Sequence, residues 1–186
     1  MIKSEAIHVI AKPVQERAVQ WERSELVIGP ATPSMLSGIV DLAKAYPYAH
    51  SVLGRAAAET YVRQLSARTN YSNEGWYAAT ISGEVVAAAY LGVYGIGDGS
   101  CHTLWKIRHP MLAEGMPGGC LAALFNVLSQ AVLKLRGGTA KLVIFLSEHE
   151  TDAITQVQDA GFQCEGRFKD YYRLGEVCLV YCKTVS

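Results

Sequence analysis

The sequence lacks a net charge, because its 17 lysines and arginines balance its 17 aspartates and glutamates over 186 residues. A chain with this balance has no electrostatic footprint for DNA, RNA or anionic lipid, so we expect no nucleic-acid partner. It also lacks an apolar run of about 20 residues, the length that a membrane-spanning helix needs, and we expect no membrane partner. With 50% apolar residues and no runs of charge, an intrinsically disordered chain is excluded.

The cysteines lack the patterns of disulfide frameworks and of metal sites. There are five, an odd number at irregular spacings: Cys101, Cys120, Cys164, Cys178 and Cys182. No pair has C-x-x-C spacing and no cluster with histidine has the spacing of a zinc site, so we predict no metal. Residues 1–24 do not have the pattern of a signal peptide. Reduced thiols and a cytoplasmic location are therefore expected.

What the sequence does have is an ordered series of strand and helix patterns. Strand patterns cover 26–28, 76–81, 84–93, 101–109, 141–146, 162–168 and 177–182, and helix patterns cover 33–46, 55–68, 121–136 and 152–160. Ser82 and Gly83 predict a two-residue hairpin turn, and Pro110 is expected to stop its strand. This order predicts one domain over residues 25–186, with helices on the faces of a mixed sheet. Residues 1–24 are expected to form an N-terminal arm or an extra strand.

Three segments of the chain resemble the GNAT superfamily of acyl-CoA-dependent N-acyltransferases. Residues 28–36 are similar to the family's opening strand and its turn into the first helix. The run from Lys106 to Pro110, with the loop and helix after it, is similar to the fourth strand and pyrophosphate loop, and residues 152–183 are similar to the closing elements. The resemblance implies an α/β (α+β) fold. Its sheet would be mixed and mostly antiparallel, with helices on both faces and splayed fourth and fifth strands.

The same resemblance implies acetyl-CoA, or another acyl-CoA, as the cofactor. Its pantetheine arm would insert between the splayed strands, while N–H groups of the following loop and helix would hold its pyrophosphate. The family's Gln/Arg-x-x-Gly-x-Gly/Ala pattern falls on residues 113–118, where only the last glycine, Gly118, is kept. The family's cofactor-contacting asparagine corresponds to Glu150. The cofactor-binding residues implied in this way are Lys106, Ile107, Arg108, Gly115, Met116, Gly118, Gly119 and Cys120.

Two catalytic residues that are usual in that family are replaced in this sequence. The tyrosine acid falls on Val157, and the carboxylate base falls on Phe145. We predict three substitutes. Glu148 could deprotonate an amine directly or through water, His109 titrates in the right range for a base, and Tyr172 could donate a proton to the departing thiolate. Each has a plainer interpretation, as a solvated loop acid, an exposed junction residue or a core tyrosine respectively.

We therefore expect a GNAT-type enzyme, an N-acyltransferase that moves an acetyl or other short acyl group from acyl-CoA to a primary amine by direct attack. The amine would belong to a small molecule or a peptide N-terminus. If Tyr46, Tyr48 and Tyr71 line the cleft, they favour a small, partly apolar amine or an amino acid. The replaced residues leave a non-catalytic acyl-CoA-binding or regulatory module as an alternative, and His102 with Thr103 leaves an acyl-CoA decarboxylase. A homodimer is compatible with the sequence.

Overall fold

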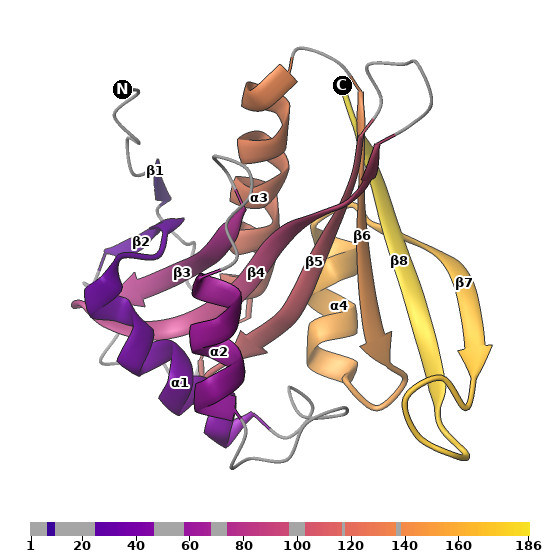
Figure 1. The fold of residues 1–186 in the computed structure, drawn as a ribbon, viewed down its shortest axis with the longest axis horizontal. Coiled ribbons are helices and arrows are strands. Elements are labelled where there is room, and N and C mark those ends of the chain that lie inside the picture. The colour runs from indigo at the N-terminus through magenta and orange to yellow at the C-terminus, as the bar shows by residue number, and fades with distance from the viewer. Residues whose placement is uncertain are drawn as a thin grey trace.

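The computed structural model describes residues 7–9, 25–46, 58–67, 74–96, 103–116, 118–136 and 139–186. These residues form an eight-stranded sheet with helices on both faces (Figure 1). The strands are β1 (Ile7–Val9), β2 (Leu26–Pro30), β3 (Gly75–Ile81), β4 (Glu84–Ile96), β5 (Thr103–Leu112), β6 (Ala140–Ser147), β7 (Gln163–Lys169) and β8 (Val177–Val185). The helices are the short 3-10 helix η1 (Pro33–Met35), α1 (Leu36–Ala45), α2 (Ala58–Ser66), α3 (Cys120–Arg136) and α4 (Thr151–Asp159).

The sheet is antiparallel except near its centre. Its strand order is β1-β2-β3-β4-β5-β6-β8-β7, and among the described strands only β5 and β6 run parallel. Because β1 pairs with β2 and precedes it in the chain, the strands expected as the fourth and fifth are β5 and β6. Ser82 and Gly83 have φ of 52° and 84° and form the predicted turn between β3 and β4. The predicted mixed, mostly antiparallel sheet is confirmed.

Each face of the sheet buries an apolar core of its own. On one face, α3 and α4 pack on the sheet through a cluster that includes Leu121 and Ile144. On the other face, α1 and α2 cover β3, β4 and the end of β5 through a cluster that includes Ile39, Val62 and Met111. Figure 1 shows α1 and α2 in front of β3 and β4, with β6, β8 and β7 to one side of them. The prediction of helices on both faces is confirmed.

The parallel pair of strands separates part of the way along its length. The ladder between β5 and β6 runs from Thr103 and Ala140 to Ile107 and Ile144, and it ends there. Beyond this point β5 stays paired with β4, whereas β6 stays paired with β8. The two strands therefore diverge toward their C-terminal ends (Figure 1). This divergence is the splay that the resemblance predicted.

Pro110 does not stop the strand, so that prediction was wrong. β5 continues to Leu112 because a bulge in the β4–β5 ladder absorbs His109 and Pro110. His109 has a φ of 49° there, in the left-handed region. Proline lacks the N–H group that a ladder needs, but a bulge tolerates it. The bulge lies just past the last residue of β5 that pairs with β6.

Some of the predictions concern residues outside the described part of the chain and stay predictions. These residues are Tyr48, Tyr71, Cys101, His102 and most of residues 1–24.

The four described cysteines are free thiols, and only Cys164 is exposed. Among the described side chains, no group of three His, Cys, Asp or Glu residues gathers that could hold a metal ion. None of the described helices combines the length and the apolar character that crossing a bilayer requires.

Candidate functional site

The loop that leads from β5 into α3 has an open, glycine-rich backbone. Gly115 and Gly119 have φ of 76° and 98°, a region that favours glycine. Gly118 lies between them without a positive φ, and a Cβ atom added there would meet no atom within 4 Å. The first turn of α3 carries no acidic side chain. Space and the helix dipole therefore both suit an anion beside Gly118.

A side chain from α4 caps this end of α3. The carboxamide oxygen of Gln156 accepts hydrogen bonds from the N–H groups of Gly119 at 3.1 Å and of Leu121 at 2.9 Å. Gln156 is only 5% exposed, so the packing of α4 on α3 holds the cap in place. Two main-chain donors at the predicted pyrophosphate site thus already have an acceptor within the protein. Sequence analysis missed Gln156, because a glutamine on a helix carries no signal of a partner on another helix.

Several residues that were predicted to bind the cofactor turn their side chains away from the loop. Ile107, Met116 and Cys120 belong to, or pack against, the core beneath α3 and α4. Burial raises the pKa of the Cys120 thiol, which keeps it neutral. Only the main chain of these three residues is therefore placed to bind a ligand.

Glu150 is a partly buried carboxyl in the turn between β6 and α4. Its Oε1 accepts a hydrogen bond from the Ser147 N–H at 2.8 Å, and its Oε2 accepts one from the Tyr46 hydroxyl at 3.4 Å. Burial raises the pKa of Glu150 to about 7; these two hydrogen bonds oppose the rise, and the nearby Glu176 adds to it. A carboxyl that titrates near neutrality is suited to accept a proton from an amine. The resemblance assigned Glu150 only to a cofactor-contacting position, so its burial could not be foreseen.

Glu148, the predicted base, is bound to the start of β8. Its Oε1 accepts a hydrogen bond from the Val177 N–H at 3.0 Å, and its own N–H donates to the Val177 carbonyl at 2.9 Å. The side chain is half-buried. Glu148 therefore lies beside the divergence of β5 and β6, with one carboxylate oxygen already engaged in holding β8 to the turn after β6.

His109, the other predicted base, faces α2. Its Nε2 lies 3.0 Å from the hydroxyl oxygen of Tyr61, and the two rings are nearly perpendicular with centroids 5.1 Å apart. The left-handed bulge conformation of His109 directs the ring into this contact. His109 thus takes part in the packing of β5 against α2, and its role as a base stays a prediction.

The two tyrosines before β8 have different surroundings. Tyr171 is 50% exposed and stacks on Phe145, with ring centroids 5.7 Å apart. Tyr172 lies edge-on to Tyr171, with centroids 4.7 Å apart, and is more buried. Burial raises the pKa of Tyr172, and the nearby Glu150 acts in the same direction. Tyr172 is therefore protonated at neutral pH and lies within electrostatic range of Glu150, as a proton donor to this site must.

Comparison with known proteins identifies this architecture through solved structures alone. No family model matches the sequence, and no curated protein matches it. NAA60 of Arabidopsis thaliana, solved with a bisubstrate analogue, matches at 15% identity and TM-score 0.65 over 87% of this chain and 99% of that one. Ribosomal-protein-alanine N-acetyltransferase from Brucella melitensis matches at 17% identity and TM-score 0.65 over 85% and 99%. A GNAT-family acetyltransferase from Bacillus cereus matches at 11% identity and TM-score 0.61 over 85% and 96%.

The raised pKa of Glu150 predicts how the stability of the fold depends on pH. The folded state holds this proton up to a pH of about 7, whereas an unfolded glutamate releases it near pH 4.3, so ionisation destabilises the fold as pH rises through this window. Replacement Glu150→Gln removes the effect. As the pH rises from about 5 to about 8, which is about 1 unit above the Glu150 midpoint, the free energy of unfolding of the variant should increase relative to that of the parent by up to about 3 kcal/mol. Urea unfolding at both pH values measures it, with the exposed Glu84→Gln as the control that should show no gain.

Proposed function

We propose that this chain, which has the fold of the GNAT acetyltransferases, moves an acyl group from acetyl-CoA or another acyl-CoA to a primary amine. The observation that carries the proposal is the divergence of β5 and β6 after Ile107 and Ile144, with a carboxyl that titrates near neutrality at its edge. That carboxyl, Glu150, is hydrogen-bonded to Ser147, the last residue of β6. A proton acceptor therefore lies near the point where β5 and β6 diverge.

Three features of the chain suit an acyl-CoA. Among the described strands, the stretch of β5 from Arg108 to Leu112 has no partner on its β6 side, so an extended pantetheine arm can pair with it. The N-terminus of α3 attracts a phosphate group through its dipole and its N–H groups. The space beside Gly118 leaves room for that group. A bound acyl-CoA would supply the acyl group as an activated thioester.

An anion that binds at the N-terminus of α3 must displace the Gln156 carboxamide oxygen. Its carboxamide oxygen is neutral, whereas a phosphate oxygen is charged and accepts a stronger hydrogen bond. We therefore propose that a pyrophosphate takes over the N–H groups of Gly119 and Leu121 from Gln156. In the absence of an anion, the same carboxamide keeps these donors satisfied.

The chemistry requires a neutral amine and a proton for the departing sulfur. An alkylammonium has a pKa of about 10.4, so a base must accept its proton near neutral pH. The first proton of the ammonium passes through the Glu150 carboxylate to solvent and leaves a neutral amine. The carboxylate then accepts a second proton from the same nitrogen while the N–C bond forms and the C–S bond breaks. The Tyr172 hydroxyl donates a proton to the leaving sulfur, and exchange with solvent then restores both residues. At the point of divergence, the N–H group of Ile107 or Arg108 that faces the gap would polarise the acyl carbonyl.

Gly118 offers a direct test of the anion site. Replacement Gly118→Glu should lower the affinity for acetyl-CoA about tenfold or more, because a carboxylate beside the α3 N-terminus repels the pyrophosphate and competes for its donors. The fold should tolerate this change, since the new Cβ meets no atom within 4 Å. Isothermal calorimetry measures the affinity, and Gly118→Ala is the matched control. Equal affinities for the two variants would place the pyrophosphate elsewhere.

Gln156→Leu should move stability and affinity in opposite directions. Loss of the cap leaves two N–H groups without an acceptor and should lower the free energy of unfolding by about 1–2 kcal/mol. The same loss frees both donors for the pyrophosphate and should raise the affinity for acetyl-CoA about threefold or more. Urea unfolding and calorimetry give the two values, and Gln158→Leu, on the exposed side of α4, is the control. A weaker affinity in Gln156→Leu would contradict the exchange of acceptors.

The two acidic residues after β6 can be separated by kinetics. Glu150→Gln should lower kcat about 100-fold or more and remove the rise of kcat/KM with pH that is centred at about 7. Glu148→Gln should lower kcat less than about tenfold, because its main contact is with the Val177 N–H. Release of thiol from acetyl-CoA, followed from pH 5.5 to 9 (about 2 units to either side of the Glu150 midpoint), gives both profiles. The opposite ranking would make Glu148 the base, as the sequence predicted.

The alternatives from the sequence give different outcomes in the same assay. A binding or regulatory module would bind acetyl-CoA with no thiol release across a broad panel of amines. A decarboxylase would shorten a carboxylated acyl-CoA without any amine, which the mass of the product would reveal. Steady acylation of an amine contradicts both.

A further inference from the structure

Two cations lie at neighbouring positions on the α1–α2 face of the sheet. Lys106 and Arg108 occupy alternate positions on β5, so their side chains leave the same face, opposite Gly92 and Tyr90 of β4. Neither residue forms an ion pair within the described part of the chain. Burial lowers the pKa of Lys106, and repulsion by the nearby Arg108 lowers it further. Two neighbouring positive charges without compensation are suited to an anionic ligand.

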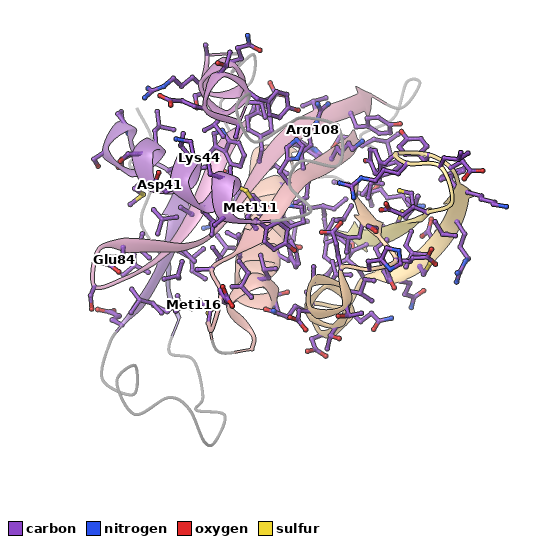
Figure 2. All side chains as sticks on the ribbon, turned by 90° about the horizontal axis from the view of Figure 1, so that it is seen from below. Asp41, Lys44, Glu84, Arg108, Met111 and Met116 are labelled. Atoms are coloured by element: carbon purple, nitrogen blue, oxygen red, sulfur yellow. The ribbon has the colours of Figure 1, made fainter. Side chains whose placement is uncertain are left out.

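The guanidinium group of Arg108 is also incompletely hydrogen-bonded. Its Nε is buried without a hydrogen-bond partner, the only side-chain nitrogen or oxygen in this state among the described residues. Buried donors are nearly always paired, so an unpaired one calls for a physical explanation. Figure 2 labels Arg108 between the α1 and α2 helices and the β7–β8 end of the sheet. A guanidinium group matches a carboxylate in shape and charge.

Aromatic rings surround the ammonium group of Lys106. Its Nζ lies 3.8 Å from the ring centroid of Phe145 and 5.6 Å from that of Tyr94. Tyr171 stacks on the Phe145 ring. Tyr94 and Tyr171 are 54% and 50% exposed, so an apolar ring surface faces solvent beside the two cations. Such a surface is suited to the apolar part of a small ligand.

The cations and the proposed base belong to one cluster. Tyr172 has electrostatic interactions with both Arg108 and Glu150. The buried thiol of Cys178 has electrostatic interactions with both Lys106 and Glu150. Glu150 also accepts a hydrogen bond from Tyr46, which packs against the α1–α2 core. Its carboxylate is therefore placed on the side of the sheet that carries the two cations, where a small ligand can contact both.

We propose that the acyl acceptor is a free α-amino acid with an aromatic or large apolar side chain. Its carboxylate binds Arg108 and Lys106, its side chain packs on the exposed ring of Tyr171, and its amine faces Glu150. The inference rests on the proposed acyl transfer and names the class of acceptor for it. A peptide N-terminus fits less well, because it has no free carboxylate beside its amine.

Three acceptors that differ only near the amine test this inference on the unaltered protein. With acetyl-CoA, phenylalanine should be acetylated with a kcat/KM about tenfold or more above those of phenylalaninamide and phenethylamine. The amide has the less basic amine and thus more of the reactive neutral form, so intrinsic reactivity opposes the expected order. Thiol release and the mass of N-acetylphenylalanine give the result. Equal or better use of phenylalaninamide and phenethylamine would overturn the inference and leave acyl transfer intact.

A substitution at Arg108 tests the contact itself. Arg108→Gln keeps the main-chain N–H of this position and should lower kcat/KM for phenylalanine about tenfold or more, mainly through KM. The loss should be much smaller for phenethylamine, which lacks the carboxylate. Arg167→Gln, on the exposed strand β7, is the matched control and should change neither. If Arg108→Gln does not fold, Lys106→Met provides the same comparison. Equal losses for both acceptors would overturn the inference.

A failure of acyl transfer can be told apart from a failure of the inference. If acetyl-CoA binds but no amine is acetylated, the proposed function fails. Calorimetric binding of phenylalanine and phenethylamine then decides whether the carboxylate site exists. Tighter binding of phenylalanine that is lost in Arg108→Gln supports the carboxylate site. Equal or undetectable binding of the two overturns it.

Discussion

The ladder between β5 and β6 ends at Ile107 and Ile144, and the proposed site is built around that end. β5 keeps β4 as its neighbour through the bulge, and β6 keeps β8 as far as Ser147. Each strand thus retains one neighbouring strand, and the sheet stays continuous. Main-chain groups on the facing edges of β5 and β6 lose their hydrogen-bonding partners. Unpaired main-chain groups are costly unless water or a ligand satisfies them. A gap of this kind is therefore compatible with a stable fold when it serves as a place where an extended ligand can pair.

Helix α4 connects the two halves of the proposed site. Glu150 immediately precedes this helix, and Gln156 projects from it to the N-terminus of α3. The proposed base and the helix cap thus belong to one helix that packs against α3. A displacement of α4 would change the surroundings of the carboxyl and the availability of the α3 N–H groups together.

Local patterns predicted the elements of this fold, but they did not predict which side chains meet. Strand β6 and the β3–β4 turn follow from an apolar run and from Ser82–Gly83, which are properties of adjacent residues. Pro110 was misjudged, because a bulge depends on where the neighbouring strand lies. No local pattern shows which of Glu148 and Glu150 is the better base. Their surroundings differ because the fold brings Val177 to one and buries the other beside Tyr46. Such contacts between distant segments require the coordinates.

Strand β5 presents different groups to each side of the proposed reaction. Alternation places Ile107 in the core beneath α3 and directs Lys106 and Arg108 to the opposite face, while the edge of the strand is free to pair with an extended arm. A thioester at that edge would lie between the two faces, so an amine held on the α1–α2 face can reach the acyl carbon from the side opposite to α3. The balanced net charge of the chain conceals this local excess of two cations. Two cations compensate a single carboxylate but not the many phosphates of a nucleic acid, so the local pair and the neutral whole both favour a small acceptor that carries one carboxylate.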